Sequence, residues 1–150
     1  MVEGKFISGQ EDLSEILRIR EEVFGKEQAV QNRTDMPDDK CMHVIGYDQG
    51  RPAAAGSIYY DGWECVIHSV AVREGCRGQG LGDFVVRMLI DRAFMANVPE
   101  ISVEVPVQLK GFFEKIGFHQ EENNGDPGKG TYIKMKLGKT ELHKCCDCHE

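Results

Sequence analysis

The most constraining feature of this chain is an apolar run that leads through a short turn into a glycine-rich loop. The apolar run covers residues 66–72, and the loop has glycines at positions 78, 80 and 82. Apolar residues then recur at helical spacing: Leu81, Val85, Val86, Leu89, Ile90, Ala93 and Phe94. The pattern predicts a buried strand, a loop, and a helix that starts directly after the loop.

Such a loop is suited to bind an anion. Glycines leave backbone N–H groups uncovered, and a helix N-terminus adds positive partial charge. A turn alone would need one glycine, so three at alternate positions favour a binding loop over a structural turn. The spacing excludes two nucleotide motifs: Gly82 comes one residue too early for G-x-G-x-x-G, and no lysine follows it as G-x-x-x-x-G-K-[ST] requires.

Composition limits the class of protein. With 150 residues, 41% hydrophobic and 29% charged, we expect one globular domain. No apolar run approaches the ~18 residues of a membrane span, and the first residues lack the apolar core of a signal peptide, so we expect a cytoplasmic protein that does not insert into membranes. The net charge of −7 argues against a nucleic-acid partner. Without a secretory signal, the six cysteines are expected to be reduced.

The order of expected elements suggests the architecture. Ser8 and Glu11 form a capping-box pattern that predicts a helix ending at Gly25. The remaining expected elements are strands at 2–7, 41–47, 52–60, 63–72, 101–105, from 118 and at 131–137, and helices from 81 and at 108–116. Strands joined by hairpins and then alternating with helices predict one mixed sheet with helices on both faces.

Three motifs resemble one known superfamily. Arg77, Gly80 and Gly82 match [RQ]-x-x-G-x-[GA], the acetyl-CoA signature of the GNAT (GCN5-related N-acetyltransferase) superfamily. Residues 112–118 are similar to its late motif F-Y-x-K-x-G-F. Residues 20–28 resemble the R-x-x-V-F-x-x-E-Q pattern in the first helix of the YjcF-like and ElaA-like branches. The resemblance covers residues 2–137, so the expected domain is 1–137, followed by a flexible Cys-rich tail at 138–150.

The resemblance implies a fold, a co-substrate and a reaction. The fold is α/β (α+β), a single mixed, mostly antiparallel sheet with helices on both faces. The reaction is direct transfer of an acetyl group from acetyl-CoA to a primary amine of a small molecule or peptide, and a homodimer is implied. Backbone N–H groups at 70–72 would stabilise the oxyanion and pair with the pantetheine arm. The implied cofactor-binding residues are Val70, Ala71, Val72, Arg77, Gly78, Gln79, Gly80, Leu81, Gly82, Gln108, Phe113 and Lys115.

Phe113 departs from the superfamily pattern. It occupies the position where a tyrosine commonly protonates the CoA thiolate, and phenylalanine has no proton to donate. The thiolate then leaves unassisted, through water, or with help from another donor; Tyr132, Cys41 and Cys65 are the candidates. The departure also leaves open an alternative function, a non-catalytic acyl-CoA-binding or sensor module.

Two residues are candidates for the base that deprotonates the amine. Glu64 and His68 share one face of the expected strand because side chains alternate along it. His68 has the better intrinsic pKa, and Glu64 would act through a water. Each also fits a structural role, Glu64 as a solvated strand end and His68 as a core histidine. Acidic or polar residues that can shape the acceptor entrance are Glu22, Glu27, Gln28, Asp38 and Asp39.

The cysteine-rich tail carries soft metal ligands. Cys145 and Cys148 have the C-x₂-C spacing of a zinc pair, but a structural zinc site needs a second pair. We therefore predict no metal site, while a thiol- or metal-responsive role for the tail stays open as a third function.

Overall fold

The computed structural model describes residues 1–25, 36–60, 62, 64–120, 132–139 and 142. Within these residues, seven strands form one sheet in the order β1-β2-β3-β4-β5-β7-β6. Neighbouring strands run antiparallel except β4 and β5, which are parallel. The strands are β1 (Val2–Ser8), β2 (Met42–Asp48), β3 (Arg51–Tyr60), β4 (Cys65–Val72), β5 (Glu100–Pro106), β6 (His119–Gln120) and β7 (Tyr132–Gly138). The prediction of a single mixed, mostly antiparallel sheet is confirmed.

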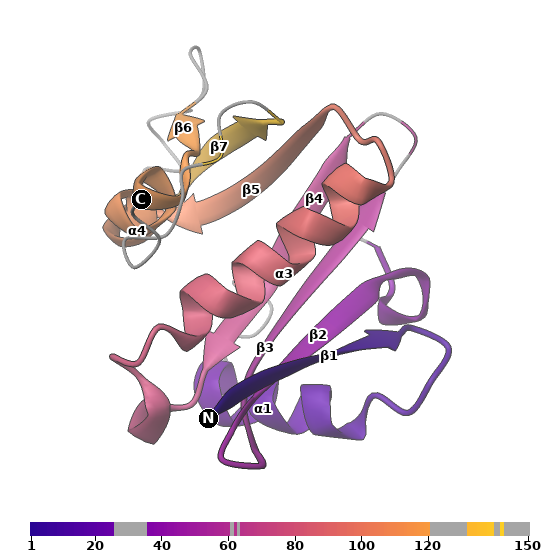
Figure 1. Ribbon diagram of the computed structural model, residues 1–150, viewed down its shortest axis with the longest axis vertical. Coiled ribbons are helices and arrows are strands. Elements are labelled where there is room, and N and C mark those ends of the chain that lie inside the picture. Colours follow the sequence, from indigo (N-terminus) through magenta and orange to yellow (C-terminus); the bar gives the residue numbers. More distant parts are fainter. Residues whose placement is uncertain (26–35, 61, 63, 121–131, 140–141, 143–150) are drawn as a thin grey trace.

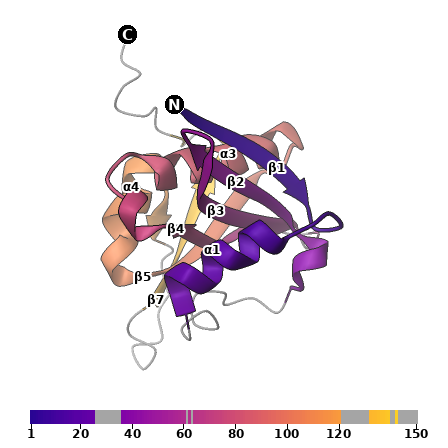
Figure 2. The ribbon, with the colours of Figure 1, turned by 90° about the horizontal axis from the view of Figure 1, so that it is seen from below.

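In the described part of the chain, three α-helices cover the two faces of this sheet. They are α1 (Ser14–Phe24), α3 (Leu81–Met95) and α4 (Lys110–Ile116), and short 3₁₀ turns η2 (Asp38–Lys40), η3 (Glu74–Cys76) and η4 (Val107–Leu109) link other elements. Figure 2 shows α1 and α3 on opposite sides of the sheet. The predicted helix at 108–116 is therefore split between η4 and α4.

The larger core lies between the sheet and helices α3 and α4. All seven residues of the apolar stripe predicted for the helix after the glycine loop are buried there. Phe113 of α4 packs edge-to-face against Phe112 and Phe118, with ring centroids 5.0 and 5.4 Å away. Burying this stripe fixes the direction of α3, so its N-terminus lies near the C-terminal end of β4 (Figure 1).

A smaller core lies between the other face and α1. Ile16 and Ile19 of α1 are fully buried against Ile45, Ala55 and Ala71. The hairpin that joins β2 and β3 turns at Gln49 and Gly50, which take positive φ values of 54° and 82°, and Asp48 pairs with Arg51. The contacts of Ile16 and Ile19 hold α1 against β2, β3 and β4.

The predicted start of α1 is wrong by several residues. Ser8 belongs to β1, and α1 begins at Ser14 with Leu13 as its cap residue. The capping-box pair still forms one hydrogen bond, from the Ser8 N–H to the Glu11 carboxylate at 2.9 Å, but it closes a turn after the strand. The predicted end at Gly25 is confirmed, since the Gly25 N–H donates to the Glu21 carbonyl.

Several predicted features lie outside the described residues. They are Glu27, Gln28, and the tail with Cys145 and Cys148. Leu142, the last described residue, packs against the larger core. In the described part of the chain, Cys41, Cys65 and Cys76 form no disulfide, and no helix has the length and apolar character needed to span a membrane.

Candidate active site

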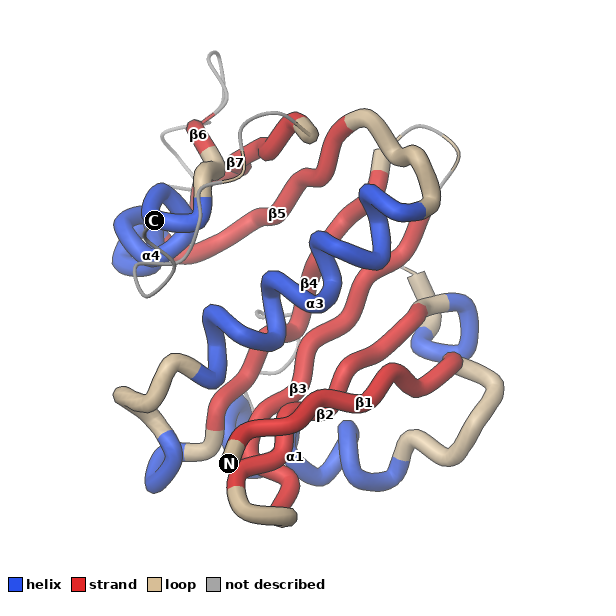
Figure 3. Tube along the Cα trace, in the orientation of Figure 1, coloured by secondary structure: helices blue, strands red, loops and turns tan. Residues whose placement is uncertain are grey.

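A cleft opens where β4 and β5 separate. The two strands pair from Cys65 and Ile101 to Ile67 and Val103, and they diverge beyond that point (Figures 1 and 3). The cleft has a volume of about 200 Å³. Its lining residues are His68, Ser69, Val70, Val72, Gly82, Val103, Glu104, Val105, Pro106, Leu109, Phe112 and Phe113. It therefore joins the end of the glycine loop to the middle of the sheet.

A β-bulge shapes the β4 wall of this cleft. Ala55 pairs with Ala71, but Ser57 pairs with His68, so Ser69 and Val70 together face Gly56. Ser69 takes a φ of +57°, in the left-handed region. The extra residue breaks ladder pairing locally and turns the backbone of 69–70 toward the cleft side. This bulge overlaps the segment in which the oxyanion donor was expected.

The bulge also changes which face the later side chains occupy. Cys65 and Ile67 lie in the core beneath α3, and simple alternation would put residue 71 with them. Instead Val70 and Val72 pack toward that core, and Ala71 is buried against α1. Of the three residues expected to contact the cofactor at 70–72, Val70 and Val72 line the cleft, and Ala71 is buried in the smaller core.

The glycine loop forms the other end of the cleft. Gly78 and Gly80 have φ values of 82° and 79°, and Gly80 caps α3 in the left-handed conformation. A Cβ on Gly82 would lie 3.5 Å from the Phe112 and Val72 side chains, so the backbone passes close to the cleft wall. The first N–H groups of α3 and the dipole of the helix thus give this end a positive character.

The other expected cofactor residues take varied positions. Phe113 is 2% exposed and lines the cleft, whereas Gln79, Gln108 and Lys115 are exposed and are not among its lining residues. Leu81 is buried in the core, so it can offer only its backbone. The Arg77 side chain is exposed, and its Nε donates to the Val72 carbonyl at 2.9 Å, which ties the loop to the end of β4.

His68 lies at the point where the two strands separate. It is 5% exposed, its Nδ1 lies 2.9 Å from the Ser69 hydroxyl, and its Nε2 lies 3.6 Å from the Cys41 sulfur. Burial, and to a lesser extent the charge of Arg20, lowers the pKa of His68 to about 4. The imidazole is therefore neutral at physiological pH and hydrogen-bonded on both nitrogens.

Glu64 lies before the first residue of β4 and outside the cleft lining. Its carboxylate is 3.5 Å from the Lys134 ammonium, and both side chains are about one-third exposed. Glu104 on β5 does line the cleft. Because Ile67 and Val103 form the last pair of the ladder, the next residues on the two strands are His68 and Glu104. Sequence reasoning missed Glu104, although its position in the alternating strand at 101–105 was visible.

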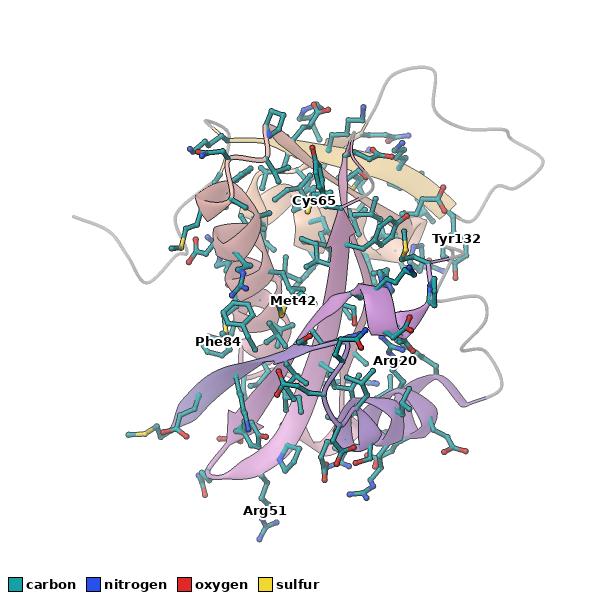
Figure 4. The ribbon with its side chains drawn as sticks, turned by 90° about the vertical axis from the view of Figure 1, so that its right-hand side faces the viewer. Arg20, Met42, Arg51, Cys65, Phe84 and Tyr132 are labelled. Atoms are coloured by element: carbon teal, nitrogen blue, oxygen red, sulfur yellow. The ribbon has the colours of Figure 1, made fainter. Side chains whose placement is uncertain are left out.

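A closed ring of hydrogen bonds, which we call the Arg20 ring, fixes the elements behind His68. Arg20 is 1% exposed; its Nη1 contacts both Asp38 carboxylate oxygens at 2.9 and 3.0 Å, and its Nη2 donates to Ser57 at 2.7 Å. Ser57 is 2.6 Å from His43 Nδ1, and His43 Nε2 is 3.0 Å from the Asp38 carbonyl. Figure 4 shows Arg20 between α1 and the sheet.

Elementary chemistry sets the direction of every bond in the Arg20 ring. A backbone carbonyl only accepts, so His43 Nε2 carries the proton, and Nδ1 of the neutral ring accepts from the Ser57 hydroxyl. Burial lowers the pKa of His43, which agrees with a neutral imidazole. The ring attaches η2 to α1 and to the two strands that precede β4, and Cys41 follows η2 directly.

The other candidates have mostly structural surroundings. Glu22 lies 3.1 Å from Arg73 Nε, Cys65 is buried in the core beneath α3, and Tyr132 begins β7 opposite Pro106. Asp39 offers its carbonyl to the Gln10 side chain at 2.8 Å. In the described part of the chain, no group of three His, Cys, Asp or Glu side chains is arranged to hold a metal ion.

Comparison with known proteins identifies the family. Residues 11–118, well over half of the chain, match the model of the acetyltransferase (GNAT) family. The chain belongs to the GNAT family. The N-acetyltransferase activity with acetyl-CoA as co-substrate, which the motifs implied, is thereby confirmed.

Individual GNAT relatives agree with this assignment. The L-methionine sulfoximine/L-methionine sulfone acetyltransferase of Pseudomonas aeruginosa is 30% identical over 152 residues, covering 88% of this chain and 86% of that protein. The N-acetyltransferase YjcF of Bacillus subtilis, described as uncharacterized, is 25% identical over 111 residues, covering 73% and 79%.

Solved structures share the GNAT fold. Escherichia coli ElaA aligns with a TM-score of 0.75 and 22% identity, covering 91% of this chain and 99% of that one. A GNAT acetyltransferase from Elizabethkingia anophelis with acetyl-CoA bound aligns with a TM-score of 0.68 and 13% identity, covering 91% and 97%. The YjcF-like and ElaA-like resemblance is thus confirmed from both sequence and fold.

Proposed function

We propose that this GNAT protein acetylates the primary amine of a small molecule inside the β4–β5 cleft, with acetyl-CoA bound along β4. The observation that carries the proposal is the continuity of the cleft with the glycine loop. The pyrophosphate of CoA would lie on the N–H groups of residues 78–82 at the start of α3. The pantetheine arm would then follow β4 to the bulge, with its thioester near residues 69–70.

The bulge supports a role for the backbone in stabilising the oxyanion. Attack of the amine on the thioester carbonyl puts negative charge on oxygen, and a fixed N–H group directed at that oxygen lowers the barrier. We propose the Val70 N–H as this donor, because Val70 belongs to the bulge and lines the cleft. Apart from proline, which lacks a backbone N–H, no substitution at position 70 would remove this donor directly.

Glu104 and His68 flank the position of the attacking amine in this proposal. An amine near neutral pH is mostly ammonium and must lose a proton before it attacks. Glu104 is exposed and can attract the ammonium and take its proton directly or through water, whereas His68 is neutral because burial lowers its pKa to about 4. We therefore propose that Glu104 accepts the proton of the amine and that His68 lies beside it as a neutral residue. Glu64 is the competing candidate for this role.

Two glutamate variants test this assignment. We expect Glu104→Gln to lower kcat/KM for the amine by about 100-fold while leaving acetyl-CoA binding intact. The matched control is Glu64→Gln, because Glu64 is the other candidate carboxylate but lies outside the cleft lining. For this variant we expect kcat/KM to change by less than about threefold. A large loss with E64Q and a small one with E104Q would transfer the role to Glu64.

The activity itself is tested by CoA release across a panel of amines that includes L-methionine sulfoximine. That compound is chosen because a 30% identical relative is named for acetylating it. Acetyl-CoA should also raise the melting temperature by binding the native state. Stabilisation without CoA release from any amine would favour the binding-module alternative, and no stabilisation at millimolar acetyl-CoA would contradict both.

A further inference from the structure

The departing sulfur of CoA gains negative charge in a cleft whose wall is largely apolar. Phe113 occupies the position of the usual donor, and it is 2% exposed against the Phe112 and Phe118 rings. Among the described residues that line the cleft, Ser69 carries the one hydroxyl group. The search for a donor to the sulfur therefore leads to Ser69.

Ser69 has an unusual conformation for a serine. It is 3% exposed, and its φ of +57° lies in the left-handed region that favours glycine. Strain of this kind persists where the surrounding structure maintains it, and it concentrates at functional sites. Glycine would meet the backbone requirement more easily, so the side chain itself needs an explanation.

The hydroxyl of Ser69 ends a chain of polar contacts that runs through His68 to Cys41. His68 Nδ1 lies 2.9 Å from Ser69 Oγ, and His68 Nε2 lies 3.6 Å from Cys41 Sγ. Burial raises the pKa of the Cys41 thiol to about 11, so the thiol keeps its proton. The Cys41 sulfur also lies 3.5 Å from the Pro37 carbonyl, which competes for that proton.

These contacts allow two arrangements of protons. If the Cys41 thiol donates to Pro37, His68 carries its proton on Nε2, and the Ser69 hydroxyl must donate to Nδ1. If the thiol donates to His68 Nε2, His68 carries its proton on Nδ1 and donates to Ser69. The Ser69 hydroxyl is free to donate into the cleft in the second arrangement.

We propose that the Ser69 hydroxyl donates a hydrogen bond to the sulfur of acetyl-CoA as the C–S bond breaks, supported by the second arrangement of Cys41 and His68. The inference rests on the proposed function, which brings the thioester to residues 69–70. The amine first forms the C–N bond and places negative charge on the carbonyl oxygen; when that oxyanion collapses, the C–S bond breaks and the electron pair of the C–S bond stays on sulfur. Ser69 keeps its proton, Glu104 takes the amine proton, and the thiolate takes a proton from water after it leaves.

A change of leaving group tests the proposal directly. Ser69→Gly removes the hydroxyl and suits the positive φ, so the variant should fold. With acetyl-CoA we expect kcat to fall by about 10- to 100-fold with little change in KM for acetyl-CoA. In the selenium analogue of acetyl-CoA, the leaving group is more acidic and needs less stabilisation. With this acetyl donor, kcat of S69G should therefore fall by less than about threefold.

Controls separate this proposal from a structural role and from the proposed function. Ser102→Ala removes another buried hydroxyl, which lies on β5 outside the cleft lining, and should change neither rate by more than about twofold. E104Q should lower kcat by the same factor with acetyl-CoA and with its selenium analogue. An equal loss in S69G with both donors would overturn the role of Ser69. Failure of the wild type to acetylate any amine with either donor would instead overturn the proposed function.

The arrangement of protons has its own readout. In the second arrangement, ¹⁵N NMR of His68 should report a proton on Nδ1. We expect Cys41→Ala to move that proton to Nε2 and to lower kcat with acetyl-CoA by about threefold, with a smaller effect on the selenoester. A proton on Nε2 in the wild type would overturn the Cys41 part of the proposal.

Discussion

The two ends of the cleft are formed by different kinds of chemical groups. At the glycine loop, the proposed binding groups are backbone amides of exposed residues, and the conformation depends on Gly78 and Gly80. At the His68 end, the groups are buried side chains of α1, β2, β3 and β4, together with the partly exposed Asp38 of η2. The comparison teaches that a cofactor site can be local in sequence while the reacting end depends on segments that are far apart.

The largest effect should follow from breaking the Arg20 ring. Arg20→Met leaves the Asp38 carboxylate and the Ser57 hydroxyl without their buried cation, and we expect a loss of about 3–5 kcal/mol in the free energy of unfolding. Urea denaturation measures it. Arg18→Met is the control, because Arg18 is 62% exposed and its ion pair with Glu15 should contribute less than about 1 kcal/mol. Similar losses in the two variants would contradict the importance of the ring.

The buried histidines should make stability depend on pH in one direction. His68 has an ordinary pKa of 6.5 when unfolded and about 4 when folded, so the unfolded state binds the proton first as pH falls. Stability is therefore complete above pH 6.5 and falls by about 3 kcal/mol as the pH reaches 4. Urea titrations across this range measure the slope.

The histidine variants identify the source of that slope. His68→Gln should flatten the pH dependence between 6.5 and 4, leaving the smaller part due to His43, whose pKa burial also lowers. Ser102→Ala changes a buried residue that carries no group titrating in this range, and it should leave the slope as it is. A slope that is unchanged in H68Q would contradict the assignment.

A more moderate effect is expected at the glycine loop. Gly80→Ala places a Cβ at a φ of 79° and should weaken acetyl-CoA binding by about tenfold, measured by calorimetry. Gly50→Ala is the matched control, since Gly50 has a φ of 82° in the β2–β3 hairpin. Each variant should lose about 1 kcal/mol of stability, but only G80A should lose affinity. Equal affinities would mean that the loop is a structural turn.

The smallest effect should come from restoring the usual tyrosine. Because Ser69 already supplies a donor in our proposal, Phe113→Tyr should change kcat by less than about threefold in the wild type. In the S69G background the same change should recover part of the lost rate. A tenfold gain in the wild-type background would indicate that the native cleft lacks a donor.

The sequence predicted what depends on local pattern. The α3 stripe and the start of that helix directly after the glycines at 78 and 80 each follow from spacing within a few residues, and each is confirmed. The start of α1 was wrong because Ser8 and Glu11 form the same hydrogen bond in a turn as in a capping box. Pairwise local chemistry did not distinguish the two structures.

The reacting end was harder to predict because it depends on register. The alternation that placed Glu64 and His68 on one face says nothing about where β4 and β5 separate, and that point decides which residues line the cleft. Glu104 becomes relevant only once Val103 is known to pair with Ile67. The partners of Arg20 are 18 and 37 positions away, so no motif contains them.

The bulge at Ser69 sets the phase of β4. It shifts the alternation of side chains along the strand by one residue, because Ile67 and Val70 pack toward the same core although they are three positions apart. If Ser69 paired as an ordinary strand residue instead of forming the bulge, the composition of β4 would be unchanged, and Val70 and Val72 would still turn toward α1 and Ala71 toward α3. Every side chain of β4 after the bulge changes face with it, so Val70 and Val72 reach the cleft wall only because the strand carries this extra residue.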